Sequence, residues 1–190
     1  MIRLFVTTIL SAWLVFPAMA GGIDAASINN AEYRSKSPTE DKIDAVVVKV
    51  QVLLDRAQFS PGEIDGKLGE NAEKALRAFA EAKGLPSDKA LTADVWHMLV
   101  AGSPDAAITE YKISESDVKG PFLEKPPAKM EDMKNLKALS YASPHEAIAE
   151  KFHMSEGLLE ALNPRKKFDQ AGEIVSVANV LKNEEPVPVV

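Results

Sequence analysis

The stretch Phe59-Ser60-Pro61-Gly62-Glu63-Ile64-Asp65-Gly66-Lys67-Leu68-Gly69 decides how the first half of this 190-residue chain folds. Its Pro-Gly and Asp-Gly pairs are turn signals, because proline fixes φ and glycine reaches left-handed backbone conformations. The residues before it predict a helix with its N-cap at Thr39. The apolar residues of that helix recur at the 3,4 spacing of one buried stripe: Ile43, Val46, Val47, Val50, Leu53, Leu54 and Ala57.

Two further helices follow the loop. The second has Ala72, Ala75, Leu76 and Phe79 on one face and ends at Gly84, a residue type favoured just past a helix end. The third begins at Thr92 and ends before Gly102, with Val95, Trp96, Leu99 and Val100 as its apolar residues. Residues 39–102 are therefore predicted to form a small three-helix bundle.

The second half indicates a different arrangement. Residues 108–113 alternate apolar and polar side chains, as a strand at a sheet edge does. Ser143-Pro144 predicts a helix start with proline in the first turn. Another helix begins at Ser155 and ends at Asn163-Pro164, and residues 174–177 form a second short strand. We expect a small α+β unit of order strand, helix, helix, strand over residues 141–180, preceded by a linker or insertion at 103–140 that carries its first strand. The fold class is mainly α.

The first half resembles the three-helix type of peptidoglycan-binding domain. The family pattern of a helix ending in "LL", a G-x-x-D-G-x-hydrophobic-G loop, "A-hydrophobic-x-x-F", "G-L" and "T-x-x-x-W" occurs here in order. The matching residues are Leu53-Leu54, Gly62 to Gly69, Ala75 to Phe79, Gly84-Leu85 and Thr92 to Trp96. Most of this motif holds the fold together, and the resemblance implies Asp65 and Gly66 as candidate peptidoglycan contacts.

Two positions depart from that family. Ala72 stands where a threonine is usual, and Ala80 stands where a glutamine is usual. Methyl groups cannot hydrogen-bond a sugar or a peptide, so we expect the second unit to contribute more to binding than the first.

Tyr141 to Val177 resembles a LysM domain, the other common peptidoglycan-binding module. The matching residues are Ile148-Ala149-Glu150-Lys151-Phe152, Leu158 to Asn163-Pro164, and Gly172 to Val177. The usual "G-D-T-L" opening is replaced by Ser143-Pro144-His145-Glu146. LysM contacts are usually backbone groups at the start of the first helix and after the second helix. The resemblance therefore implies Ser143, Pro144, Asn163 and Pro164 as glycan contacts, although Ser143 could only cap one helix and Asn163 only close the other.

The ends of the chain carry no predicted fold. Arg3, the apolar run from Leu4 to Phe16 and Ala18-Met19-Ala20 have the pattern of a cleavable signal peptide over residues 1–20. The run is shorter than the roughly 20 residues that span a bilayer, so we expect no membrane attachment after cleavage. Residues 21–38 are predicted to be a flexible leader and 181–190 a linker-like tail. The expected location is periplasmic or secreted.

Composition excludes several functions. The chain has no cysteine, which removes disulfides, thiolate catalysis and cysteine-based zinc sites. Its net charge of −6, with no basic tract, argues against nucleic-acid binding. His97, His145 and His153 lack the spacing of a helical zinc site, and no paired carboxylates or G-x-S-x-G elbow indicate hydrolase chemistry. We expect no catalytic residue, no metal and no cofactor.

The sequence thus predicts an exported, non-catalytic protein that binds the glycan and stem peptide of peptidoglycan. A peptidoglycan-binding domain followed by a LysM-like unit also resembles the front half of certain L,D-transpeptidases, so a truncated or degenerate enzyme of that kind is one alternative. An envelope protein–protein adaptor, with a protein partner in place of the cell wall, is the other.

Overall fold

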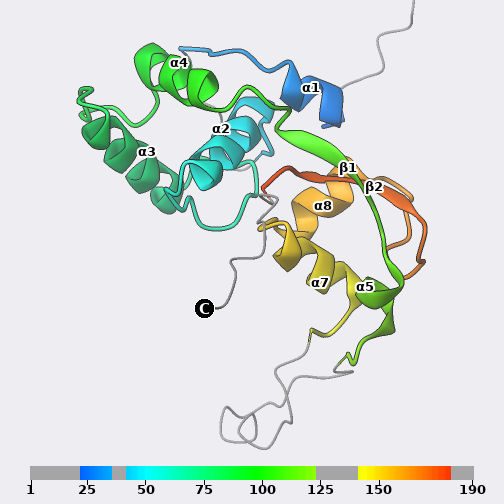
Figure 1. The fold of residues 1–190 in the computed structure, drawn as a ribbon. Coiled ribbons are helices and arrows are strands. Elements are labelled where there is room, and N and C mark those ends of the chain that lie inside the picture. Colours follow the sequence, from blue (N-terminus) through cyan, green and yellow to red (C-terminus); the bar gives the residue numbers. More distant parts are fainter. Residues whose placement is uncertain (1–21, 36–41, 123–140, 181–190) are drawn as a thin grey trace, which may run out of the picture.

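The computed structural model describes residues 22–35, 42–122 and 141–180. The predicted signal peptide, the predicted cap Thr39 and the tail 181–190 lie outside these ranges. The described residues form seven helices and one two-stranded antiparallel sheet (Figure 1), so this part of the chain is mainly helical, as predicted.

Three helices make up the first unit: α2 (Ala45–Arg56), α3 (Glu70–Ala82) and α4 (Ala93–Gly102). The second and third were predicted with nearly these bounds, and Thr92 caps α4 by accepting a hydrogen bond from Val95 N. The predicted start of the first helix was wrong. Asp44, not Thr39, precedes the helix in an extended conformation, and its carboxylate accepts from the first-turn amides of Val46 and Val47.

The core of the first unit lies where these three helices meet. Phe79 and Trp96 contribute its aromatic side chains, and Phe59 packs edge-on against Phe79 with ring centroids 5.4 Å apart. Ala80, where the family that the first unit resembles usually has glutamine, is fully buried in this core. An alanine here avoids placing an amide among apolar side chains, where it would need hydrogen-bond partners.

The second unit contains β1 (Ile108–Lys112), α5 (Glu115–Lys119), α7 (Pro144–Lys151), α8 (Glu156–Leu162) and β2 (Ile174–Ala178). The two strands pair antiparallel, with Ile108 opposite Ala178 and Lys112 opposite Ile174. The predicted order of strand, helix, helix, strand is confirmed, with α5 as an element that the sequence analysis did not predict. Ala107, Ile108 and Ile113 are buried, so this stretch of the predicted linker belongs to the core of the second unit.

The expectation of a flexible leader at 21–38 was wrong for its first part. Residues Ala25–Asn29 form the short helix α1, which Asp24 and Ser27 close with a reciprocal capping box. Ile28 is fully buried among residues of the second unit, and this apolar anchor is why the segment is ordered despite its polar composition.

Two asparagine side chains cover the outer edges of the sheet. On β1, Asn29 accepts from Ile108 N (2.8 Å) and donates to Ile108 O (3.0 Å). On β2, Asn163 accepts from Ser176 N (2.6 Å) and donates to Ser176 O (2.8 Å). Each carboxamide thus makes the pair of bonds that a neighbouring strand would make, which keeps these backbone groups from attracting another chain.

Helix α2 is shared by both units. Val46, Val50, Leu53 and Leu54 pack in the core with α3 and α4, whereas Val48 and Val52 pack in the core of the second unit. Figure 1 shows α2 between the helices α3 and α4 on one side and the sheet with α8 on the other. The two units are therefore joined through a common helix.

Polar contacts reinforce this junction. Ile64 forms a parallel bridge with Met154, in which Ile64 N donates to His153 O (2.8 Å) and Ser155 N donates to Ile64 O (3.0 Å). At the end of α2, the Arg56 guanidinium donates to Ser103 Oγ and to the carbonyls of Asp105, Ala106 and Asn179. Burial lowers the pKa of Arg56, and the charges of Asp105 and Asp55 partly offset that effect.

Candidate functional site

A groove between the start of α7 and the end of α8 contains most of the predicted glycan contacts. It encloses about 420 Å³ and is lined by Ser143, Pro144, His145, Asn163, Phe168 and neighbouring charged residues. We call it the α7–α8 groove. Pro164, the fourth residue predicted from the LysM resemblance, is exposed and does not line it.

Ser143 and Asn163 both have structural duties at this groove. The Ser143 hydroxyl caps α7 by accepting from Glu146 N at 3.1 Å, as a serine before a helix commonly does. The Asn163 side chain is 4% exposed, and it bonds Leu159 O as well as Ser176. Their side-chain polar groups are thus used within the fold, which leaves backbone groups and the shape of the groove for a ligand.

An aromatic pair forms another wall of the groove. The rings of His145 and Phe168 stack with centroids 4.5 Å apart and planes 24° apart. The His145 Nδ1 atom lies 3.0 Å from Glu156 Oε2, which fixes the ring orientation. Its Nε2 is buried without a hydrogen-bond partner among the described residues. Flat rings beside polar groups suit a sugar, which presents apolar C–H faces and hydroxyl edges.

The rim of the groove carries charges of both signs. Arg165 and Lys166 follow α8, where cations interact favourably with the helix dipole. Lys166 pairs with Glu173 at 2.6 Å, and Glu160 and Asp169 also line the groove. This mixed rim favours a largely neutral polar ligand over a strongly charged one.

The two candidate residues in the first unit, Asp65 and Gly66, lie in a turn that Gln51 organises. The Gln51 side chain is 1% exposed; its Oε1 accepts from Asp65 N and Gly66 N, and its Nε2 donates to Asp65 Oδ1 (2.9 Å). Gly66 has φ +74°, and an added Cβ would come within 2.7 Å of Ile43 Cγ2. These contacts give both residues a role in the fold.

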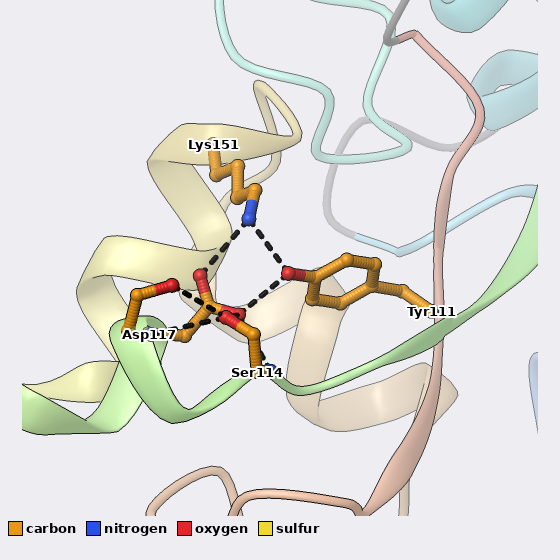
Figure 2. Close-up of polar contacts among 5 residues, drawn as sticks. Tyr111, Ser114, Asp117 and Lys151 are labelled. Atoms are coloured by element: carbon orange, nitrogen blue, oxygen red, sulfur yellow. Dashed lines mark hydrogen bonds and ion pairs between the residues drawn. The ribbon is translucent and has the colours of Figure 1, made fainter.

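A polar cluster joins β1 and α5 to α7 (Figure 2). The Lys151 Nζ lies 2.7 Å from Tyr111 Oη and 2.9 Å from Asp117 Oδ1, while Tyr111 and Ser114 donate hydrogen bonds to Asp117 Oδ2. Burial alone would raise the pKa of Asp117, but the hydrogen bonds from Ser114, Tyr111 and Lys151 lower that pKa well below its ordinary value. Burial alone would lower the pKa of Lys151, but its bonds to Tyr111 and Asp117 raise that pKa overall.

This cluster has the chemistry of a structural anchor. A nucleophile or base needs its reactive form available, whereas here Asp117 is held ionised and Lys151 is held protonated. Each charged group is engaged by partners within the cluster. We therefore interpret the cluster as the link that fixes the start of α5 against the end of α7.

Sequence reasoning missed several of these residues. His145 and Phe168 are 23 positions apart, and Asp117 and Lys151 are 34 apart, so no local pattern connects either pair. Gln51 lies two residues before the Leu53-Leu54 pair of the motif, and its position among the buried valines and leucines of α2 was an available signal of a buried polar role. No group of three or more His, Asp or Glu side chains within the described ranges is placed to hold a metal ion.

Within the same ranges, the helices are too short or too polar to cross a membrane.

Comparison with known proteins connects the first unit to a family. None of the curated proteins compared matches the chain. Residues 44–99 match the family model described as "putative peptidoglycan binding domain", from the cap of α2 to the last buried leucine of α4.

Proposed function

We propose that this protein is an exported, non-catalytic peptidoglycan-binding protein whose α7–α8 groove holds the glycan. The match of residues 44–99 to the peptidoglycan-binding family model is the observation that carries the proposal. The second unit supports it, because α7 and α8 lie between its two strands in the chain, and Ser143, Pro144 and Asn163 line one groove, as the LysM resemblance implies.

Binding would use the two units as one rigid surface. Two linked modules gain affinity through a raised effective concentration. Here both cores include α2, so the groove keeps a fixed position relative to α3 and α4. A pre-formed surface avoids the entropy lost when loose modules are ordered on a ligand.

Co-sedimentation with purified sacculi tests the proposal. Phe168→Ala removes half of the aromatic pair and should weaken binding by about five- to tenfold, the effect of losing roughly 1 kcal/mol of stacking. Glu160→Trp fills the groove from an exposed position of α8 and should have a similar effect without touching a core residue. Ile174→Ala, which changes a 49% exposed apolar side chain on β2, is the matched control and should bind normally.

The outcomes separate the alternatives. If the unaltered chain fails to sediment with sacculi, the envelope-adaptor interpretation replaces this one. If it binds but both groove variants bind equally well, the groove has been assigned wrongly. Point variants are preferable to cutting the chain near residue 104, because residues on both sides of that point share one core.

Export and the lack of catalysis have separate tests. N-terminal sequencing of protein from the cell envelope should begin near Gly21, and another start would contradict signal cleavage. The purified chain should neither cross-link muropeptides nor form a covalent β-lactam adduct. An adduct detected by intact-mass spectrometry would favour an enzyme related to the L,D-transpeptidases.

A further inference from the structure

A second groove lies where the ends of α2, α3 and α4 meet the residues after β2. It encloses about 910 Å³, and its lining includes Phe59, Phe79, Met98, Arg56, Lys83 and Val180. We call it the junction groove. Its wall combines apolar and polar side chains, and its volume is that of a site for a small organic ligand or a short peptide. Met98, 41% exposed, is one of the larger exposed apolar side chains among the described residues.

The two cations of the junction groove, Arg56 and Lys83, differ in how many partners they have. Arg56 uses its guanidinium to hold four backbone and hydroxyl oxygens, and the charge of Asp105 acts on that same guanidinium. Lys83 is exposed, and its Nζ lies over the Phe79 ring, 5.6 Å from the centroid. Within the described ranges, no carboxylate forms an ion pair with Lys83. Among the residues that the structure describes, Lys83 is therefore a cation without an ion-pair partner, and the apolar side chains of Phe59 and Met98 line the same groove.

This combination selects a ligand that is small and apolar with one negative end. A stem peptide of peptidoglycan that ends in alanine has this chemistry, because its methyl groups suit Phe59 and Met98 and its terminal carboxylate suits Lys83. We propose that the junction groove binds the alanyl carboxylate end of the stem peptide. This proposal rests on the proposed function and adds the stem peptide to the glycan as a bound part of the cell wall. A second copy of the chain fits less well, since a net charge of −6 makes two copies repel each other.

Two synthetic stem peptides ending in D-alanyl-D-alanine, one with a free carboxylate and one amidated, provide the test. Fluorescence anisotropy should show the free peptide binding and the amidated peptide binding about tenfold more weakly, the effect of losing a hydrogen bond to a charged group. Lys83→Gln should cause the same loss, and Lys83→Arg should restore binding. Lys74→Gln removes a lysine elsewhere on α3 and should change nothing. Ala101→Glu adds a carboxylate at an exposed lining position and should also weaken binding.

Sacculus co-sedimentation, performed in parallel, distinguishes this proposal from the proposed function. If the chain binds sacculi but neither peptide binds, or both peptides bind equally, the junction-groove proposal is overturned and the proposed function stands. If the free peptide binds through Lys83 but sacculi do not, the groove proposal stands and the proposed function fails. If sedimentation velocity shows that the chain dimerises and that Lys83→Gln abolishes the dimer, the junction-groove proposal is overturned in favour of self-association.

Discussion

The two units of this protein are stabilised by different means. The first, α2 to α4, is packed from aliphatic and aromatic side chains, with Gln51 as its buried polar residue. The second, β1 to β2, adds to its apolar core a side-chain amide at each sheet edge and the Tyr111–Asp117–Lys151 cluster. A two-stranded sheet is marginal by itself, and five-residue strands bury little area, so these directional contacts fix what apolar packing alone leaves loose.

The largest effect should come from emptying a core, and it should show that the units unfold together. Phe79→Ala in the first unit and Leu158→Ala in the second should each lower the free energy of unfolding by about 2–5 kcal/mol. Because α2 belongs to both cores, each variant should retain one cooperative transition, seen alike by Trp96 fluorescence and by far-UV circular dichroism.

Hydrogen exchange provides the decisive check on that prediction. Leu158→Ala should speed amide exchange in α3 and α4 as well as in α7 and α8. Faster exchange confined to the second unit would mean that the shared helix does not couple the two cores.

Removal of the sheet-edge amides should have the next largest effect. Asn163→Ala leaves the amide and carbonyl of Ser176 without these partners and should cost about 2–3 kcal/mol in denaturant unfolding. Asn29→Ala should cost less, about 1–2 kcal/mol, because Asn29 is only partly buried and water can replace it. The neighbouring exposed residue Asn30 is the control, and Asn30→Ala should be close to neutral. If all three variants lose an equal and negligible free energy of unfolding, the side-chain amides at the sheet edges do not stabilise the fold.

The Asp117 cluster should make the second unit sensitive to acid. The pKa of Asp117 is lowered in the folded state, so its stabilising effect is present above the unfolded value of about 3.9 and is lost as pH falls below it. Asp117→Asn should cost about 1–2 kcal/mol at pH 7 and show a flatter stability profile between about pH 4 and pH 2.

Urea denaturation at several pH values measures this effect. Tyr111→Phe, which removes one of the hydrogen bonds to Asp117 and keeps the ring, should give an intermediate loss. If Asp117→Asn shows the same loss of stability in acid as the unaltered chain, other carboxylates determine that loss.

The smallest effect should come from the polar contact between His153 and Asp55, which joins the two units. His153 Nδ1 lies 2.9 Å from Asp55 Oδ2, but the histidine side chain is 53% exposed. Water and salt screen such a pair, so Asp55→Asn should change the free energy of unfolding by about 0–1 kcal/mol. A loss comparable to that of Asn163→Ala would show that the stability of the junction between the two units depends on this contact more than on apolar packing.

The difference between local signals and long-range contacts explains which elements could be predicted from the sequence. Helices α3, α4, α7 and α8 have local signals, such as the caps Thr92, Ser143 and Ser155 and regular apolar spacing, and these predictions were confirmed. Helix α1 was missed because it is only five residues long and only one of its side chains, Ile28, is buried, so it leaves no apolar periodicity in the sequence.

The candidate site was predictable only in part. Ser143, Pro144, Asn163 and Pro164 were predicted as glycan contacts from a family resemblance; the first three line one groove, Pro164 does not, and the binding itself stays a prediction. His145, Phe168 and Lys83 were not identified as site residues, because their roles depend on which distant elements pack beside them. Long-range pairs of polar or aromatic side chains leave no periodic trace in a single sequence.

The position of Ile28 and Asn29 also determines when the chain can finish folding. Both residues are among the first that the structure describes, yet their partners include Ile108, and the same core contains Val180. When the chain emerges N-terminus first, α1 can pack on α2 early, but the core around Ile28 is complete only after about 150 later residues, up to Val180, have appeared. Core closure is thus postponed to the last strand, and contacts between segments far apart in a chain are the kind that slow folding.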